Sequence, residues 1–162
     1  MRNTFARFAT PVVASFIATP LLGTGPSLAA GGLSCTAGEK GITLNVEGGV
    51  SHGMGAALFS FSGELTVRDK SVAADLQKTR FALEHVAQYW YDGDDLRLTL
   101  YRERDADQEH GYVQAWILAR STGEPDEGLY AGTFGVQVWD GAGDGEPRSF
   151  SAEGKIECFG GD

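Results

Sequence analysis

Near its C-terminal end the chain alternates strictly between apolar and polar residues, and this period of two constrains the fold more than any other feature. Between residues 149 and 158, polar residues separate the apolar or small ones, which are Phe150, Ala152, Gly154, Ile156 and Cys158. Such alternation is typical of a β-strand with one face on a hydrophobic core. Downstream of residue 30, no stretch shows a sustained apolar period of 3.6 residues. The sequence therefore predicts an all-β domain, with Cys158 on the core side of its last strand.

Two further strands are predicted before this one. Residues 128–139 alternate in the same way, and the loop at 140–147 is rich in glycine and acid. Pairing Val138 with Phe150 makes the two apolar faces coincide and sets Phe134 opposite Gly154, where a large ring packs over a glycine. In the strand at 112–120, pairing Leu118 with Tyr130 sets Trp116 opposite Gly132 in the same manner. A shift of one residue would reverse that face.

A third hairpin is centred on residues 92–95, and it pairs Tyr91 with Leu96. One face of this hairpin then carries Tyr89, Tyr91, Leu96, Leu98 and Leu100. The other face carries Trp90, Arg97, Thr99 and Tyr101, with Trp90 directly across from Arg97.

Two strands are predicted further upstream, at residues 42–47 and 58–68. In the second of them, Phe59, Phe61, Leu65 and Val67 alternate. Residues 48–55 are predicted to be a mobile connection, and residues 72–77 a single helical turn. In total, seven or eight antiparallel strands joined by short loops indicate a small β-sandwich or barrel, which forms one domain over residues 31–162.

The first 30 residues differ from the rest of the chain. Arg2 and Arg7 precede an uncharged apolar stretch at residues 8–23, and small residues follow as far as Ala30. This pattern predicts a cleaved signal peptide over residues 1–30 and a periplasmic or secreted location. Pro11 and Pro20 interrupt the apolar stretch, which is already too short for a membrane-spanning helix, and no later segment is long enough to be one.

The chain has two cysteines, Cys35 and Cys158. In an exported protein, a disulfide is the expected state of such a pair. This disulfide would join the first strand to the last. The alternative is lipidation of Cys35, but the preceding residues, Gly32-Leu33-Ser34, fit a lipobox poorly.

Acidic residues dominate the charge of the chain. It has 13 basic and 22 acidic residues, for a net charge of −9, and the leader holds two of the basic and none of the acidic ones. The domain would then carry 11 basic against 22 acidic residues, a net charge of −11. Such a field repels nucleic acid and anionic lipid and favours cationic partners.

Acidic residues also cluster in three predicted loops, at residues 92–95, 105–109 and 140–146. Asp105, Asp107 and Glu109 resemble the first half of a calcium-binding loop, although the glycine and the distal glutamate of such a loop are missing. The alternative is that these acids stabilise turns. The sequence thus predicts no cofactor, with calcium at these loops and a zinc site assembled across strands as the alternatives.

Residues for catalysis are not grouped along the sequence. His52, His85 and His110 are scattered, no G-x-S-x-G motif is present, and both cysteines are assigned to the disulfide. The sequence therefore predicts a non-catalytic protein. Exposed Trp, Tyr and Arg anchor the recognition of proteins and sugars, which makes Trp90, Arg97, Tyr101 and Trp139 the candidate binding residues. The alternative for Trp90 is that another element covers it.

A small exported β domain with a terminal disulfide resembles, in architecture, the periplasmic inhibitors of C-type lysozymes, whose targets are basic. The recognition motif of that family is an aromatic residue followed four residues later by Lys-Gly. It is absent here, since Cys35 and Thr36 stand upstream of Lys40-Gly41, and Lys155 follows its glycine. A shared architecture does not transfer function.

From the sequence we expect an exported, non-catalytic binding module that acts on a protein partner, basic and inhibitor-like, through a β face or hairpin loops. The first alternative is a carbohydrate-recognition domain that uses Trp90 and Tyr101. The second is a small hydrolase that depends on paired carboxylates.

Overall fold

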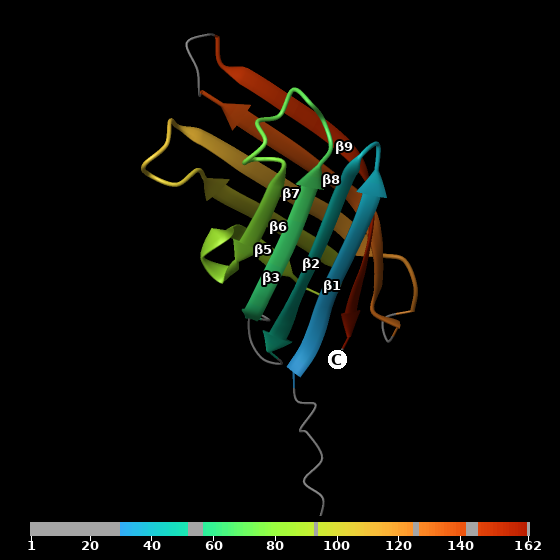
Figure 1. The fold of residues 1–162 in the computed structure, drawn as a ribbon. Coiled ribbons are helices and arrows are strands. Elements are labelled where there is room, and N and C mark those ends of the chain that lie inside the picture. Colours follow the sequence, from blue (N-terminus) through green and yellow to red (C-terminus); the bar gives the residue numbers. More distant parts are fainter. Residues whose placement is uncertain (1–29, 52–56, 93, 125–126, 142–145, 162) are drawn as a thin grey trace, which may run out of the picture.

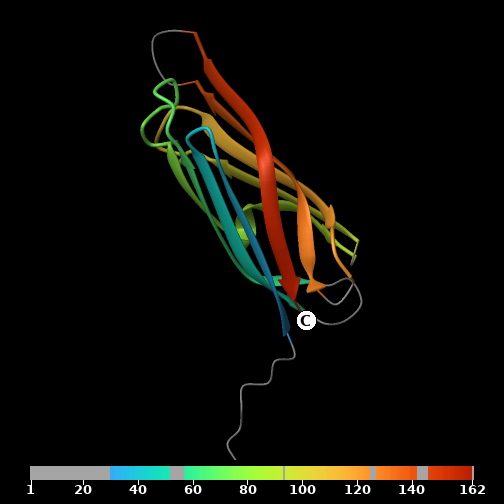
Figure 2. The same ribbon diagram turned by 90° about the vertical axis from the view of Figure 1, so that its right-hand side faces the viewer.

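The computed structural model describes residues 30–51, 57–92, 94–124, 127–141 and 146–161. Within these residues the chain forms a single antiparallel sheet of nine strands, in the order β4-β3-β2-β1-β9-β8-β7-β6-β5. The elements are β1 (Ala30–Glu39), β2 (Ile42–Ser51), β3 (Leu58–Val67), β4 (Lys78–Ala82), the 3₁₀ turn η1 (Leu83–His85), β5 (Val86–Tyr91), β6 (Asp95–Glu103), β7 (Gly111–Ser121), β8 (Leu129–Asp140) and β9 (Arg148–Gly161). The sheet curls into a nearly closed barrel, with β1 to β3 in front and β6 to β9 behind (Figure 1, Figure 2).

The barrel is incomplete between the two edge strands, β4 and β5. The first pairs with β3 and the second with β6, and η1 joins them. Because all ladders are antiparallel, β4 and β5 run in the same direction, so together they resemble one broken strand. Side chains bridge the break: Nη1 of Arg102 donates to the carbonyl oxygen of Arg80 at 2.7 Å, and the amide of Ala82 donates to Nδ1 of His85 at 2.9 Å.

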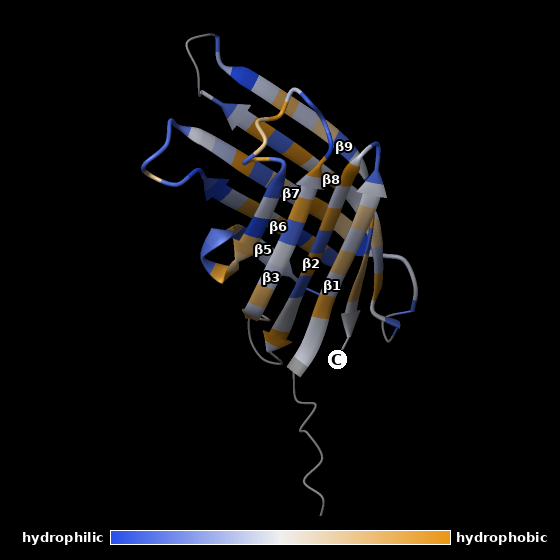
Figure 3. Ribbon diagram, in the orientation of Figure 1, coloured by the Kyte–Doolittle hydropathy of each residue, from blue (hydrophilic) through white to orange (hydrophobic). Residues whose placement is uncertain are grey.

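The interior of the barrel is filled by apolar side chains. Along most strands, buried apolar residues alternate with more exposed residues, many of them polar, which is visible as stripes along the ribbons (Figure 3). The largest fully buried side chains include Phe134, Leu44, Leu65, Leu98 and Ile117. A barrel of about eight strands is narrow enough for side chains to fill it, and here buried or partly buried apolar side chains from all nine strands and their flanking segments occupy the interior, so function is to be sought on its outside or at its ends.

The predicted disulfide is present. Cys35 and Cys158 face each other in the β1–β9 ladder, with Cα atoms 4.0 Å apart, and both side chains are buried. The bond therefore lies inside the barrel and links the first strand to the last, as the alternation in the last strand predicted.

Two of the predicted registers are confirmed. Val138 pairs with Phe150, and Phe134 lies opposite Gly154 in the β8–β9 ladder. Tyr91 pairs with Leu96 across the β5–β6 hairpin. In both cases a turn-rich loop and two clearly alternating strands determine the pairing.

The predicted register of β7 is wrong. Tyr130 pairs with Ser121 and not with Leu118, and Trp116 pairs with Gly135 and not with Gly132. The shift is an odd number of residues, so it turns Trp116 and Leu118 to the outside. The inward face of β7 instead carries smaller or β-branched residues, Val113, Ala115, Ile117 and Ala119, all of which are buried.

The prediction for Phe59 is also wrong. Phe59 was assigned to the same face as Phe61, but it is 41% exposed whereas Phe61 is buried. A bulge in the β2–β3 ladder is the cause: Glu47 pairs with Ser62 and Gly49 with Phe59, which leaves one extra residue on β3. Ser60, within the bulge, has a φ of 51°.

Of the predictions for the segments between the strands, some are confirmed and others are wrong. Gly48 and Gly49 belong to β2 and not to a connection, and residues 52–56 lie outside the described part. At 72–77 there is a single turn, in which the amide of Gln77 donates to the carbonyl oxygen of Ala73 at 3.1 Å. β4 and η1 were not predicted. The predicted signal peptide at residues 1–30 lies, except for Ala30, outside the described residues.

Candidate functional site

The four predicted binding residues, Trp90, Arg97, Tyr101 and Trp139, all lie on the outer face of the barrel formed by β5 to β8. Trp90 is across from Arg97 in the β5–β6 ladder and is 53% exposed. Tyr101 is four residues further along β6 on the same face. Trp139 is on β8, and its cross-strand neighbour on β7, Tyr112, pairs in turn with Glu103. The structure thus places the four residues on one face, in two groups: along β6, Tyr101 is about 13 Å and the level of Trp139 about 20 Å from Arg97.

The first group, at the start of β6, combines an exposed indole with paired charges. Nη2 of Arg97 is 3.1 Å from Oδ2 of Asp95, and Nε of Arg120 is 3.1 Å from Oδ1 of the same carboxylate. Leu118 lies across from Arg97 on β7 and is 51% exposed. This end of the face is therefore a shallow hollow with an apolar floor and charged sides.

The second group is a continuous row of aromatic rings. The ring centroids of Tyr101 and Tyr112 are 5.4 Å apart, those of Tyr112 and Trp139 are 6.1 Å apart, and those of His110 and Trp139 are 5.1 Å apart. The planes of Tyr112 and Trp139 differ by only 14°. The row crosses the outside of β6, β7 and β8.

Between the two groups lies a stretch of β7 and β8 without charged side chains. Trp116 faces outward on β7, and a Cβ atom at Gly135 would overlap its six-membered ring, so the indole lies flat against the backbone of β8. Gln114 and Gln137 pair with each other across the β7–β8 ladder on the same face. We call the outward side chains Tyr112, Gln114, Trp116, Gln137 and Trp139 the β7–β8 band.

Most of this band was missed by the sequence-based prediction. Only Trp139 was named as a binding residue, and Trp116 was assigned to the core. The sequence of β7 does contain a signal for the correct orientation. The residues that face inward are all small or aliphatic, while those that face outward include its two large rings, Tyr112 and Trp116. A barrel interior accepts the first set more readily, because its volume is limited.

Glu103 borders the band on β6. The hydroxyl of Tyr101 donates to Oε1 of Glu103 at 2.8 Å. Partial burial raises the pKa of Tyr101, and the hydrogen bond and charge of Glu103 raise it further. The phenol therefore stays neutral, and the hydrogen bond fixes its ring beside Tyr112.

The acidic residues of the 92–95 loop stabilise a turn. Oδ1 of Asp92 accepts a hydrogen bond from the amide of Asp95 at 3.0 Å, and this bond holds the pKa of Asp92 below its usual value. Such a contact is the usual role of aspartate in a tight turn.

Asp105, Asp107 and Glu109 follow β6 and are exposed. The side chain of Asp105 lies 4.0 Å from Arg102, and the carbonyl of Glu109 accepts a hydrogen bond from Arg104 at 3.0 Å. No three acidic, histidine or cysteine side chains in the described part of the chain are gathered so as to hold a metal ion. The calcium site therefore stays a prediction, without a gathered set of ligands.

Asp140 was predicted to lie in a loop, but it is the last residue of β8 and is buried at one end of the barrel. Its Oδ1 is 3.0 Å from Nη1 of Arg104, and its Oδ2 is 2.6 Å from Nη2 of Arg148. Arg104, whose side chain is only 5% exposed, also binds Asp75, with Nε to Oδ2 at 2.7 Å. Burial lowers the pKa of Arg104, but hydrogen bonds to Asp75 and Asp140 outweigh it, so the net shift is upward.

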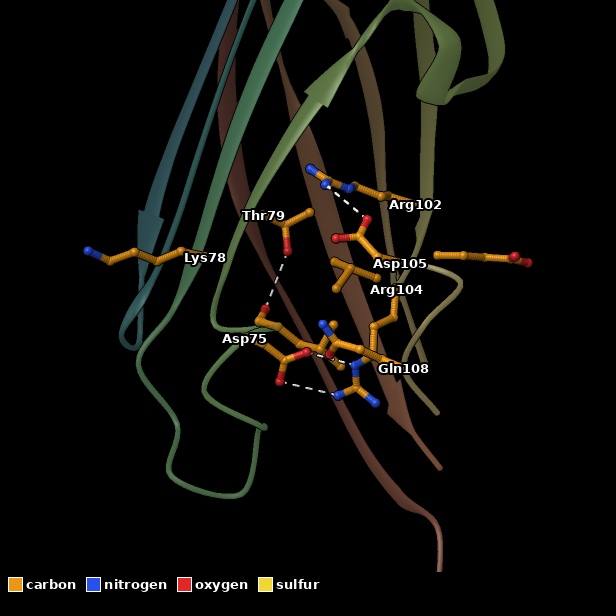
Figure 4. Close-up of a pocket in the computed structure, with 10 residues that line it drawn as sticks. Asp75, Lys78, Thr79, Arg102, Arg104, Asp105 and Gln108 are labelled. Carbon is orange, nitrogen blue, oxygen red and sulfur yellow. Dashed lines mark hydrogen bonds and ion pairs between the residues drawn. The ribbon is translucent and has the colours of Figure 1, made fainter. Parts of the chain in front are cut away.

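A small cavity of about 110 Å³ lies beside this network, in the gap between β4 and the end of β6 (Figure 4). Asp75, Thr79, Arg102 and Gln108 are among its lining residues. The hydroxyl of Thr79 donates to the carbonyl oxygen of Leu76 at 3.3 Å. The carboxylate of Asp75 is held by Arg104, so the charges at this site serve to join the barrel end to the 69–77 segment.

The histidines are not brought together by the fold. His85 accepts a hydrogen bond in η1, and His110 ends the aromatic row. His52 lies outside the described residues. Of the two described histidines, His110 therefore belongs to the candidate site and His85 does not.

Comparison with known protein families, with characterised proteins and with solved structures found no match to this chain. Among the described residues, no helix is both long and apolar enough to cross a membrane. The function of the protein is therefore inferred from the geometry of the outer face.

Proposed function

We propose that this protein is a non-catalytic binding module and that the outer face of β5 to β8 is its ligand-binding surface. The observation that carries the proposal is the uneven distribution of aromatic side chains over the outside of the barrel. Trp90, Tyr101, Tyr112, Trp116 and Trp139 all project from β5 to β8. The outer face of β1 to β4 instead presents mainly Gly, Ser, Thr, Asn, Glu, Lys and Arg, with Phe59 as its exposed aromatic residue.

Large aromatic side chains on the outside of a barrel do nothing for its core, which is already filled. They are the residue types that dominate binding energy at recognition surfaces. Their gathering on one face, in a chain with so many acidic residues, is therefore best explained by a ligand.

The proposal includes a place of action outside the cytoplasm, either the periplasm or the extracellular medium. The disulfide between Cys35 and Cys158 supports this location, since such bonds persist in oxidising compartments. The predicted leader supports it independently.

Two ligand classes are each favoured by a different part of the face. A basic protein partner fits the first group, where Trp90 and Leu118 are exposed beside Arg97 and the carboxylate of Asp95. A carbohydrate fits the β7–β8 band, whose rings and amides carry no charge.

The test of the binding surface is a panel of immobilised ligands that includes neutral polysaccharides and small basic proteins. The variants combine Trp90→Ala with Leu118→Ala for the first group and Tyr112→Ala with Trp116→Ala for the band. We expect wild-type protein to bind at least one member of the panel, and one of the two double variants to lose that binding.

The matched control alters the opposite outer face, with Thr36→Ala on β1 and Asn45→Ala on β2; both residues are exposed. The control should bind like the wild type. If the control loses binding, or if neither double variant does, the outer face of β5 to β8 is not the ligand-binding surface.

A further inference from the structure

Building on that function, we propose that the β7–β8 band binds an extended neutral polysaccharide, with Trp116 as its main stacking residue and Gln114 and Gln137 as its hydrogen-bonding residues. This ligand class is more specific than the binding function itself, and it places the site away from Trp90.

Trp116 is held against the neighbouring strand β8. Its six-membered ring lies over Gly135, and any Cβ at that position would overlap it. One face of the indole is thus covered by the backbone of β8, and the side chain as a whole is half-buried on the outer face of β7. A flat aromatic face is the surface on which the C–H side of a sugar ring stacks.

Polar side chains lie beside this ring. Gln114 precedes Trp116 by two residues on the outer face of β7 and pairs with Gln137 on β8. Primary amides offer both donors and acceptors, which match the hydroxyl groups of a sugar. Their side chains lie between the indole of Trp116 and the rings of Tyr112 and Trp139.

The charge of the band also bears on the ligand. None of the five residues of the band is charged, and the nearest acidic residues on the same rows, Glu103 on β6 and Glu153 on β9, lie at its edges. A phosphate backbone would find no opposite charge here, and a cationic protein would find one only at the edges of the band, on Glu103 and Glu153. Stacking platforms for single-stranded nucleic acid add a positively charged groove, and the band has none.

The length of the band restricts the size of the ligand. Trp116 and Tyr112 are four residues apart on one strand, which is about 13 Å. A single sugar cannot contact both rings, so the ligand must be an extended chain of several sugars. Affinity should therefore rise with chain length until both rings are engaged.

The experiment is calorimetric titration of the whole protein with soluble hexasaccharides of β-1,4-linked glucose and of β-1,4-linked N-acetylglucosamine, together with pull-down on insoluble cellulose, chitin and β-1,3-glucan. We expect binding to at least one of these probes, weaker binding of the corresponding disaccharide, and little change between 0.05 and about 1 M NaCl, because the site is uncharged.

Three variants locate the site. Trp116→Ala should weaken binding roughly tenfold to a hundredfold, the range for loss of a central aromatic anchor, and Gln114→Ala with Gln137→Ala should weaken it without removing a ring. Phe59→Ala, which removes an exposed aromatic ring from the outer face of β3, should leave binding unchanged. Circular dichroism and the thermal midpoint of each variant confirm that it is folded.

The outcomes separate this inference from the broader function. If none of the probes binds, or if Trp116→Ala binds as well as the wild type, the carbohydrate assignment is overturned. If the protein instead captures a basic protein from the immobilised panel and loses it in Trp90→Ala or at high salt, the binding function stands and the polysaccharide assignment falls.

Discussion

Tyr89 places a polar atom in an unfavourable environment. Its hydroxyl is buried and has no hydrogen-bond partner among the described residues. Burial raises the pKa of Tyr89 to about 12, and neighbouring Tyr91 adds to the shift. Two other interior tyrosines, Tyr91 and Tyr130, avoid this cost because the hydroxyl of Tyr130 donates to that of Tyr91 at 3.2 Å.

We therefore predict that Tyr89→Phe raises the free energy of unfolding at pH 8, by about 1 kcal/mol, since it removes an unsatisfied buried hydroxyl. Between about pH 10 and 12 the unfolded chain releases the Tyr89 proton while the folded protein keeps it, so wild-type stability falls as pH rises through this window. The variant should show a shallower fall. Urea unfolding at pH 8 and 11 measures both effects; lower stability of the variant at pH 8 would show that the hydroxyl has a partner.

Asp140 is buried between two arginines, Arg104 and Arg148. Asp140→Ala leaves the guanidinium of Arg104 buried with one fewer carboxylate, so we predict a loss of about 3–5 kcal/mol in the free energy of unfolding. Asp75→Ala is the matched control. It removes the other carboxylate from the same arginine, but its side chain is 45% exposed, so it should cost about 1 kcal/mol or less. Equal losses in the two variants would argue against a buried network.

Among the strands, the sequence predicted registers well where both partners alternate clearly and a loop joins them. The β8–β9 and β5–β6 pairings are such cases, as is the inward position of Cys158. β4 escaped prediction because only Thr79 and Phe81 of its five residues point inward and are buried. Such a short strand gives little periodicity.

The two errors of orientation have local causes. For Phe59, one extra residue in β3 reverses the alternation, and a bulge leaves little trace in a periodic pattern. For Trp116, two registers each place its ring over a glycine, Gly132 or Gly135. Only the limited volume of the barrel interior favours the register that turns Trp116 outward. That volume depends on all the strands together and cannot be read from β7 and β8 alone. The candidate site was therefore identified only in part.

At the level of elements, strand β1 forms two ladders, and the ladder to β9 is the shorter of the two. It contains five residue pairs, compared with ten between β1 and β2, and the disulfide lies within it. In the chain-entropy account, a bond between residues 123 positions apart stabilises the fold by roughly 5 kcal/mol.

We predict that the double variant Cys35→Ala/Cys158→Ala loses about 4–5 kcal/mol in the free energy of unfolding, and that reduction of the wild type has a similar effect. Guanidinium unfolding, with and without a reductant, measures the loss. Reductant should leave the double variant unchanged, which serves as the control. A loss below about 1 kcal/mol would mean that the β1–β9 ladder holds the barrel closed by itself.

At the scale of the whole molecule, the filled interior and the difference between the two outer faces together restrict where a ligand can bind. A barrel with no room inside can bind a ligand only at its ends or on its outside. The end with Asp140 is occupied by an ion-pair network, and the outside of β1 to β4 is polar and charged apart from Phe59. The outer face of β5 to β8 carries Trp90, Tyr101, Tyr112, Trp116 and Trp139, and its centre is the β7–β8 band.

The most direct measurement uses the three tryptophans of the chain, whose indole N–H groups give separate signals in a ¹H–¹⁵N NMR spectrum. The hexasaccharide that binds best is titrated into the labelled protein. The account predicts that the signals of Trp116 and Trp139 shift along one common binding curve while that of Trp90 stays in place. A shift of Trp90 without a shift of Trp116 would contradict it.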